Sequence, residues 1–511
     1  MTLTLKCLRN DGGVFLKAKG ILENVGGSFV MQAVNILTNL ILPPMIIACY
    51  GSKINGLIGT ITQIISYVSL VGAGLSVATT QALYKPLAEN DHETVSGMMR
   101  TTGNVFNRIG VLFLLISSLT AFLYPFLIKS DLEYFFVVLL MLIMSISGAM
   151  EFFATGRFRS LLYADRKIYV YSLIQSACLI ISTGLAIVCI KLDLSILWTQ
   201  SMISLVYVLR GLCLSIYVKK AYSYINKDSK PVDDCISKRK DAMYHQLIGL
   251  LVTGSQAILL SIFVGLEAAS IYGVYNIVFS GLQSICVQMS NSVVPYIGRV
   301  YALGNNDEMK RKYDLFELVF FIIISVIFAT SFIMIKPFIG LYTKSADINY
   351  VDELLAILFV IRGFSSCFRL PAQGLINAAG FFKETKKAAT IEAIICIVIE
   401  LMGVQFWGIY GIMLGNLAAL VWRGFEMVLY TNKYIISRIS KGSIVRIGQA
   451  TIAIVVSYYF SQLFIPINSI NHWLKWLVFA LVSVLISSIV TLTVYFFTER
   501  KNMIKAVHYF I

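Results

Sequence analysis

The chain is poor in charged residues and in residues that bind metals. Of its 511 residues, 14% are Asp, Glu, Lys or Arg, only four are histidine, and 58% are apolar. A soluble globular domain carries about 25% charged residues, so this composition excludes one. The nine cysteines contain no Cys-x-x-Cys pair and the histidines are far apart. We therefore expect no disulfide framework, no metal site and no cofactor.

The apolar residues are gathered into long stretches. A transmembrane helix needs about 20 apolar residues to cross about 30 Å of hydrocarbon, and most stretches reach that length. They run at about 26–50, 55–81, 101–127, 133–156, 168–190, 194–217, 244–266, 269–295, 315–336, 350–378, 388–407, 408–430, 446–466 and 472–497. The sequence therefore predicts an all-α polytopic membrane protein with about fourteen transmembrane helices.

Basic residues lie almost entirely on one side of these stretches. With the N-terminal side taken as one face, 32 of the 42 Lys and Arg residues fall on that face and six on the other. Basic residues of short loops stay cytoplasmic, so we expect both termini in the cytoplasm. The net charge of +15 is explained by this topology and by contact with anionic membrane lipids, and we expect no nucleic-acid partner.

The chain contains two related halves. Tyr207-Val-Leu-Arg210-Gly-Leu resembles Leu420-Val-Trp-Arg423-Gly-Phe, and two further matches occur at nearly the same offset. Such an offset indicates a duplication of six spans in the same orientation, an arrangement that places the site of secondary transporters between the halves. We predict a six-helix lobe at 1–217, a cytoplasmic linker at 218–243, a second six-helix lobe at 244–430, and two extra helices with a cytoplasmic tail at 431–511.

Polar residues recur at three- and four-residue steps in the first two spans of each half. They are Gln32, Asn35, Asn39, Gln63, Gln256, Asn276, Ser280, Gln283, Gln288 and Asn291. Because polar side chains avoid hydrocarbon, these positions predict the walls of a central polar cavity. The alternative is that they only join helices by hydrogen bonds. In the first span the stripe lies below a kink predicted at Pro43-Pro44.

Four arginines fall inside spans. Arg210 and Arg423 lie near the cytoplasmic ends of equivalent spans, where their side chains can reach head groups. Arg362 and Arg369 are seven residues apart on one helical face, and Arg362 is near mid-depth, where a charge costs about 2.5–3.5 kcal/mol. With Glu400 and Glu392 as candidate partners, they predict a cationic site for an anionic head group that Glu400 neutralises between turnovers. The alternative is a buried Arg–Glu pair that ties two helices together.

Several segments have the same kinds of residues in the same order as the corresponding segments of a known family. They include Leu42-Pro43-Pro44 with Tyr50-Gly51, the openings Asn55-Gly-Leu-Ile-Gly-Thr and Ser270-Ile-Tyr-Gly-Val-Tyr-Asn, and the loops at Leu161-Leu-Tyr-Ala-Asp-Arg-Lys and Leu375-Ile-Asn-Ala-Ala-Gly. With the six-plus-six duplication and two extra spans, the chain resembles the polysaccharide flippases of the multidrug/oligosaccharidyl-lipid/polysaccharide (MOP) superfamily. The likeness covers nearly the whole chain, through diffuse motifs.

The resemblance implies a transport function without covalent chemistry. The expected substrate is an undecaprenyl-diphosphate-linked oligosaccharide (an O-antigen, capsule or exopolysaccharide repeat unit), moved from the inner to the outer leaflet of the bacterial cytoplasmic membrane by alternating access. A glycan polymerase and chain-length proteins are the implied partners. Family members place cations in spans one, two and eight, which are uncharged in their interior here. We therefore expect Arg362 and Arg369 to bind the diphosphate, with Lys53 and Arg299 at the cavity mouth.

Each rival function would require particular residues or sequence motifs. An ion-coupled exporter of the same superfamily, driven by H⁺ or Na⁺, needs a buried carboxylate in a cavity helix, and Glu400 keeps this alternative open. A transporter of the major facilitator type would carry Gly-x-x-x-Asp-Arg-x-Gly-Arg-Arg after span two, where this chain has Lys85-Pro-Leu-Ala-Glu. A membrane-embedded glycosyltransferase or polymerase would need a large external loop with catalytic groups, whereas the external loops here are short.

Overall fold

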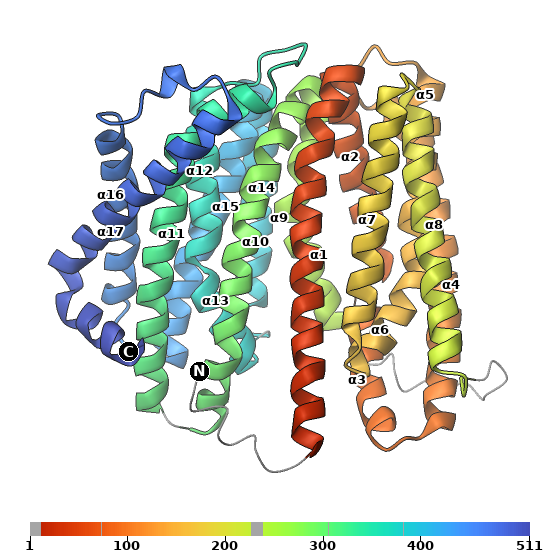
Figure 1. The fold of residues 1–511 in the computed structure, drawn as a ribbon, viewed down its shortest axis with the longest axis horizontal. Helices are drawn as coiled ribbons and strands as arrows, with labels where there is room; N and C mark the ends of the chain where they lie inside the picture. The colour runs from red at the N-terminus through yellow and green to blue at the C-terminus, as the bar shows by residue number, and fades with distance from the viewer. Residues whose placement is uncertain (1–11, 73, 226–238, 305, 382, 511) are drawn as a thin grey trace. The chain divides into compact units, whose positions relative to one another are not determined.

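The computed structural model describes residues 12–72, 74–225, 239–304, 306–381 and 383–510 (Figure 1). The chain is 87% helical, and its described residues form no strand. Thirteen helices in this part of the chain are long and apolar enough to cross a membrane, and Ile248–Phe263 adds a shorter apolar helix. The prediction of an all-α polytopic membrane protein with about fourteen spans is thereby confirmed.

The first compact unit comprises residues 1–50 and 57–247. Its helices are α1 (Gly12–Tyr50), α2 (Ser52–Val68), α3 (Leu75–Ala88), α4 (His92–Leu123), α5 (Tyr134–Met150), α6 (Gly156–Ala164), α7 (Ile168–Lys191) and α8 (Ile196–Ala221). The stretch expected as one span at 55–81 is divided, because Gly74 adopts a left-handed backbone (φ 75°) that separates α2 from α3. In contrast, α1 continues as one helix through Pro43 and Pro44. α1 packs mainly on α7, and α7 packs on α8.

The second compact unit comprises residues 51–56 and 248–511. Its helices are α9 (Arg239–Phe263), α10 (Leu266–Ala302), α11 (Asn306–Tyr342), α12 (Glu353–Phe368), α13 (Leu370–Ala379), α14 (Lys386–Trp407), α15 (Ile409–Tyr430), α16 (Lys441–Ser461) and α17 (Trp473–Phe510). Here α16 and α17 pack on each other and on α11 (Figure 1). Of the linker predicted at 218–243, residues 226–238 lie outside the described part.

The start of α2 belongs to the second unit because a cluster of hydrogen bonds holds it there. After a left-handed turn at Gly51 (φ 83°), the backbone N–H of Ser52 donates to Asp347 Oδ1 at 3.1 Å, and its hydroxyl bonds the same carboxylate. Tyr350 donates to Ser52 Oγ at 2.6 Å. Although partial burial opposes it, this hydrogen bonding by Ser52 lowers the pKa of Asp347 below its ordinary value of 3.8.

The same end of α2 also packs closely on the start of α10. Asn55 Nδ2 donates to Ser270 Oγ at 2.7 Å. A Cβ at Gly56 would lie 1.9 Å from the backbone oxygen of Leu266, so no residue larger than glycine fits without a backbone shift. Hydrogen bonds and backbone contact thus fix this turn to the second unit. We call Ser52, Asn55, Ser270, Asp347 and Tyr350 the α2 clasp.

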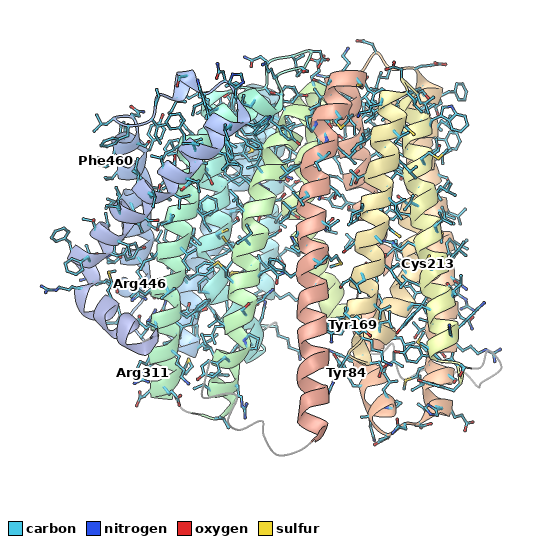
Figure 2. All side chains as sticks on the ribbon, viewed as in Figure 1. Tyr84, Tyr169, Cys213, Arg311, Arg446 and Phe460 are labelled. Carbon is cyan, nitrogen blue, oxygen red and sulfur yellow. The ribbon has the colours of Figure 1, made fainter. Side chains whose placement is uncertain are left out.

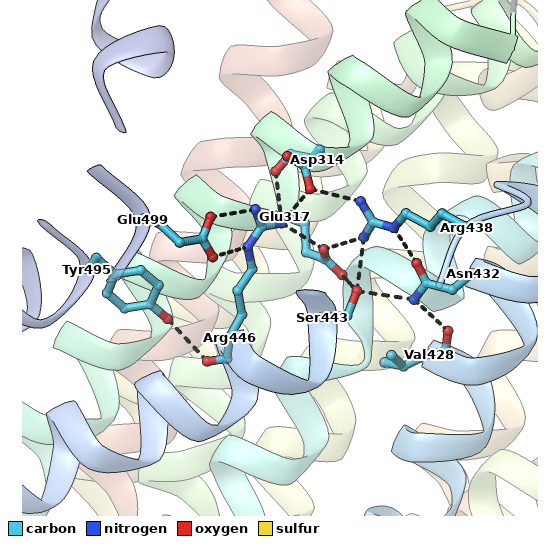
Figure 3. Close-up of polar contacts among 9 residues, drawn as sticks. All are labelled: Asp314, Glu317, Val428, Asn432, Arg438, Ser443, Arg446, Tyr495 and Glu499. Atoms are coloured by element: carbon cyan, nitrogen blue, oxygen red, sulfur yellow. Dashed lines mark hydrogen bonds and ion pairs between the residues drawn. The ribbon is translucent and has the colours of Figure 1, made fainter. Parts of the chain in front are cut away.

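A fully paired ion network joins α16 and α17 to α11 (Figure 3). Arg446 binds Glu499 through two hydrogen bonds of 2.8 Å, and its Nη1 lies 2.9 Å from oxygens of both Asp314 and Glu317. Arg438 Nη1 and Nη2 contact the same two acidic residues, at 2.8 and 2.7 Å. Arginine forks and carboxylates match in this way when an ion pair is built into a fold. We call these five residues the α11 ion network.

Most of the exposed surface of the spans is apolar. On α17, the exposed residues between 480 and 492 are Leu481, Val484, Leu485, Ile489 and Leu492. Figure 2 shows side chains such as Cys213 on α8 and Phe460 on α16, both of which are exposed. In water such surfaces would drive aggregation, whereas in a bilayer they contact lipid tails.

Candidate functional site

Arg362 is held in the second unit by side-chain amides. It lies on α12, in the Glu353–Ala379 span, whose most apolar window is 78% buried. Arg362 Nε donates to Asn416 Oδ1 at 2.7 Å, and Nη1 donates to Asn276 Oδ1 at 3.1 Å. Its guanidinium carbon is 5.7 Å from the centre of the Phe359 ring, a cation–π arrangement. Among the described residues, no carboxylate oxygen lies within 4.0 Å of this guanidinium, so its positive charge is not paired.

The aromatic ring below Arg362 is itself fixed by α10. Phe359 stacks against Tyr275 and Phe279, with ring centres 5.2 and 5.6 Å apart. Tyr272 completes the contact at 5.4 Å. Three aromatic residues three or four positions apart on α10 therefore form one face that positions α12. This packing sets the depth and direction of the Arg362 side chain.

Glu400, on α14, is completely buried in a separate set of donors. It accepts hydrogen bonds from Ser255 Oγ at 2.7 Å and from Gln256 Nε2 at 2.6 Å, both on α9. Cys396 adds a weaker contact at 3.2 Å. The predicted role of Glu400 as a direct partner of Arg362 is not seen: no ion pair joins them among the described residues. Neutral donors from α9 satisfy the carboxylate because α14 packs beside that helix.

Asn416 connects the two groups. Its Oδ1 accepts from Arg362, while its Nδ2 donates to the Val252 backbone oxygen at 2.6 Å and lies 3.6 Å from Cys396 Sγ. This asparagine lies on α15, which approaches α14 very closely. A Cβ at Gly415 would be 2.6 Å from the Glu400 backbone nitrogen. Small residues thus bring the two backbones together and place Asn416 between the arginine and the glutamate.

The second predicted arginine is part of an ion-pair chain. Arg369 Nη1 lies 2.7 Å from Glu392 Oε1, and Arg423 Nε lies 3.5 Å from Glu392 Oε2. Arg423 also pairs with Glu426. Glu392, one of the two candidate partners, is thus paired with two arginines, and Arg369 has the buried Arg–Glu pairing that was the alternative to a binding role. Because both arginines already have carboxylate partners, this region offers less free positive charge than Arg362.

The equivalent arginine of the first unit is also paired. Arg210 on α8 lies 3.4 Å from Glu151, which also pairs with Arg159 at 3.0 Å. The Glu151–Thr155 turn that carries this glutamate is a π-helix between α5 and α6. Arg210 is thus tied to its own unit, as expected for a structural role.

α10 presents an exposed polar face, in contrast to the lipid-compatible face of α17. Its window is only 17% buried, yet most of its exposed residues are polar. The predicted residues Ser280, Gln288, Asn291 and Arg299 lie on this exposed face. Exposed polar positions within a membrane span need water or a polar ligand next to them. We call these four residues the α10 polar face.

Asn276 connects this face to the buried arginine. It is half-buried and precedes Ser280 by four residues, one turn along α10 on the same side. Gln283 is also half-buried, near the edge of the face. Gln256, in contrast, is completely buried and its amide is used by Glu400. The alternative role of polar residues as links between helices therefore describes Gln256, whereas Asn276 also borders the exposed face.

The remaining predicted residues lie on α1 and α2. In the first unit, Gln32, Asn35 and Gln63 are half-buried and Asn39 is exposed. Lys53 is half-buried beside the α2 clasp, in the part of α2 that belongs to the second unit. The structure brings Arg362, Asn276, Gln256 and Glu400 into one polar cluster, and it places Arg369 with Glu392 in another.

Sequence reasoning missed three members of these surroundings. Asn416, Ser255 and Cys396 complete the polar cluster, and the first of them was detectable as an amide inside an apolar span. In the first unit, sequence reasoning also missed Arg157, which directly follows the stretch predicted at 133–156. It lies in α6, stacked 4.5 Å from the Phe158 ring, and its Nε has no hydrogen-bond partner in the described structure.

The fold can be compared with known proteins. No protein-family model matches the sequence, and no curated protein sequence matches it. Solved structures do match. The lipid II flippase MurJ in an inward closed conformation has a TM-score of 0.68 at 14% identity, over 93% of this chain and 99% of that chain. An inward-facing multidrug resistance MATE family transporter of the MOP superfamily has a TM-score of 0.62 at 13% identity, over 82% and 95%.

A third structure broadens the comparison. A MOP superfamily transporter from Pyrococcus furiosus has a TM-score of 0.57 at 12% identity, over 85% of this chain and 96% of that chain. The chain has the fold of the MOP superfamily transporters. Identities of this size establish the fold alone. Membership of the polysaccharide flippase branch, expected from the sequence, therefore remains a prediction.

Proposed function

We propose that the protein is a flippase for a polyprenyl-diphosphate-linked oligosaccharide, and that Arg362 binds the diphosphate. The observation that supports this is the amide-bound guanidinium of Arg362, which has no carboxylate within 4.0 Å in the described part of the chain. A charge this deep in a span is expensive without a partner, and it is retained where it serves an ion or substrate pathway. The fold shared with a lipid II flippase supports the same class of substrate.

The donor geometry of Arg362 suits a phosphate. An arginine has five N–H donors, and Asn416 and Asn276 take one each, on Nε and Nη1. The donors on Nη2 make no hydrogen bond to a described residue, and 8% of Arg362 remains exposed. Two parallel N–H groups can bind phosphate oxygens in the bidentate way that guanidinium favours. The α10 polar face, which begins one turn from Asn276, would hydrate the charged group on its path.

The membrane potential would favour outward movement of such a substrate. About 2.3 kcal/mol is released per negative charge moved outward across 100 mV, so a diphosphate with two charges would gain roughly 4–5 kcal/mol. No covalent step is needed, and we propose no enzymatic activity. We propose the bacterial cytoplasmic membrane as the location, with both termini cytoplasmic, from the distribution of the basic residues. Two six-helix lobes with two extra helices remain the proposed domain organisation.

Reconstitution tests this function. The purified protein would be placed in proteoliposomes with a fluorescent undecaprenyl-diphosphate oligosaccharide, and dithionite quenching would report its movement between leaflets. We expect quenching beyond the outer-leaflet fraction, and faster with an imposed potential. Empty liposomes and liposomes with an unrelated polytopic protein are the controls. Quenching no greater than in these controls, with and without a potential, would overturn the proposal.

A second candidate function is ion-coupled export of a drug or metabolite. The observation that favours it is Glu400, a completely buried carboxylate among Ser255, Gln256 and Cys396. A carboxylate inside a span is a common element of proton relays. If export is the function, a proton or sodium gradient should drive drug movement, and Glu400→Gln should abolish that coupling. The lipid-linked glycan would then stay in its original leaflet.

A further inference from the structure

A cationic cavity lies at one end of the second unit, away from Arg362. Its volume is about 350 Å³, and it lies between the C-terminal end of α11, the following loop and the segment before α17. Its lining combines polar and apolar residues, namely Lys336, Lys344, Asn471, Leu341, Ile467 and Ile470. Pockets that hold small ligands start at about 300 Å³ and are mostly apolar with a few polar groups. We call this cavity the Lys336 pocket.

Neighbouring aromatic residues place the pocket at the depth of lipid head groups. Phe338 on α11 contacts Trp473 and Trp476 at ring-centre distances of 5.6 and 5.4 Å. Trp476 also donates through Nε1 to the Met334 backbone oxygen at 3.2 Å. Tryptophans concentrate where a membrane meets water, and these two begin the apolar helix α17. Lys336, two residues before Phe338, and Lys344, just after the end of α11, therefore lie near the level of head-group phosphates.

The charges of the pocket are available to a ligand. Lys336 Nζ is 3.3 Å from Glu353 Oε2, but the two side chains are 47% and 68% exposed. Ion pairs with this exposure contribute little, so a phosphate can compete for the lysine. Lys344 is exposed and forms no ion pair with a described residue. Asn471, which also lines the pocket, adds an amide donor.

We propose that the Lys336 pocket binds the phosphate of an anionic membrane lipid. The two ammonium groups would contact the phosphate, and Leu341, Ile467 and Ile470 would contact the start of the acyl chains. Because these apolar residues line the same cavity as the lysines, a lipid fits better than a free phosphate, which has no apolar part. This inference concerns a site on the periphery of the second unit and does not depend on the proposed flippase activity.

Lipid-dependent thermal stability of the detergent-purified full chain tests the site. The unfolding midpoint would be followed by tryptophan fluorescence while phosphatidylglycerol, phosphatidylcholine or inorganic phosphate is titrated in. We expect saturable stabilisation by phosphatidylglycerol alone. Each lysine near a phosphate contributes a factor of roughly five in affinity, so Lys336→Gln with Lys344→Gln should weaken binding by roughly 25-fold. Equal stabilisation by phosphatidylcholine or by inorganic phosphate would overturn the assignment to an anionic lipid.

Two single variants make the test specific. Glu353→Gln removes the competing carboxylate and should tighten phosphatidylglycerol binding. Lys475→Gln removes an exposed lysine on α17 that does not line the pocket, and it should leave binding unchanged. A loss of binding in Lys475→Gln as large as in Lys344→Gln would show attraction to the surface in general and would contradict the site. If the double variant fails to fold, the single Lys344→Gln, at an exposed position, carries the same test.

Discussion

The second unit holds buried arginines in two different ways. In the α11 ion network, Arg446 is enclosed by Asp314, Glu317 and Glu499, so every charge has an opposite charge in contact. Arg362 is also buried, with 8% of it exposed, but its partners are the neutral amides of Asn276 and Asn416. A network in which every charge is already paired can only hold helices together. A guanidinium bound by amides keeps its full charge, and it can attract an anion that arrives later.

Removing Arg446 should have the largest effect on stability. Arg446→Gln would remove the arginine that pairs with Glu499, and within the α11 ion network it would leave Asp314 and the buried Glu317 paired with Arg438 alone. Breaking a buried pair by removing one partner costs about 3–5 kcal/mol, because the other charge stays buried without compensation. We expect a sharp fall in the unfolding midpoint in detergent, and release of α17 from α11 detected by proteolysis. An unfolding midpoint equal to that of the wild type would show that the network is not structural.

Removing Arg362 should instead affect ligand binding more than folding. Arg362→Gln keeps an amide donor for Asn416, so stability should fall much less than in Arg446→Gln. A hydrogen bond to a charged group contributes about 1.5–3 kcal/mol, which predicts roughly 10- to 150-fold weaker binding of undecaprenyl diphosphate. Microscale thermophoresis would measure this binding affinity. Arg369→Gln is the matched control, since that arginine already pairs with Glu392 and should matter less. Equal losses of binding affinity in both variants would show that Arg362 and Arg369 do not differ in role.

Disrupting the helix packing that places Asn416 should have a smaller effect on stability. A Cβ at Gly411 would lie 2.0 Å from the Gly403 backbone oxygen, so Gly411→Ala must push α14 and α15 apart. Overpacking of this kind costs about 1–3 kcal/mol. Gly249→Ala on α9 is the control, because nothing lies within 4 Å of its added Cβ. Thermal unfolding should separate the two variants. Equal unfolding midpoints would mean that α14 and α15 are more loosely packed than described.

The smallest expected effect concerns pH and the α2 clasp. The pKa of Asp347 is lowered in the folded protein, so its contribution to stability is full above the ordinary value of 3.8. That contribution is lost as the pH falls through the lower folded value. We expect Asp347→Asn to unfold at a lower temperature than the wild type at about pH 6, with the difference shrinking at about pH 3. A difference in unfolding temperature that grows as the pH falls would contradict this role of Asp347 in the α2 clasp.

The fold was largely predictable, because hydropathy over some twenty residues reports directly on membrane crossing. The described chain has thirteen long apolar helices and a shorter one at Ile248–Phe263, and the stretch at 55–81 is divided by the left-handed Gly74 between α2 and α3. A single left-handed glycine inside an apolar run leaves little trace in a hydropathy pattern. α1 continues through Pro43 and Pro44, and the kink expected there stays a prediction.

The site was predictable only as a set of residue types. The spacing of Arg362 and Arg369 showed that both lie on one face of a span, but not which partner each would meet. That choice depends on the rotation and closeness of neighbouring helices. Arg369 pairs with Glu392, one of the two candidate carboxylates, whereas Asn416 takes the place beside Arg362 that was considered for Glu400. The close contact of Gly415 with Glu400 decides this, and glycine spacing alone does not reveal it.

The central claim is that Arg362 is a binding group rather than a structural one. The most direct measurement is dithionite quenching of the labelled undecaprenyl-diphosphate oligosaccharide in proteoliposomes, comparing the wild type with Arg362→Gln and Arg362→Lys at equal amounts of folded protein. We predict that the glutamine variant loses at least about nine-tenths of the translocation rate, and that lysine, a point charge without the fork, restores part of it. Wild-type rates in both variants would contradict the account.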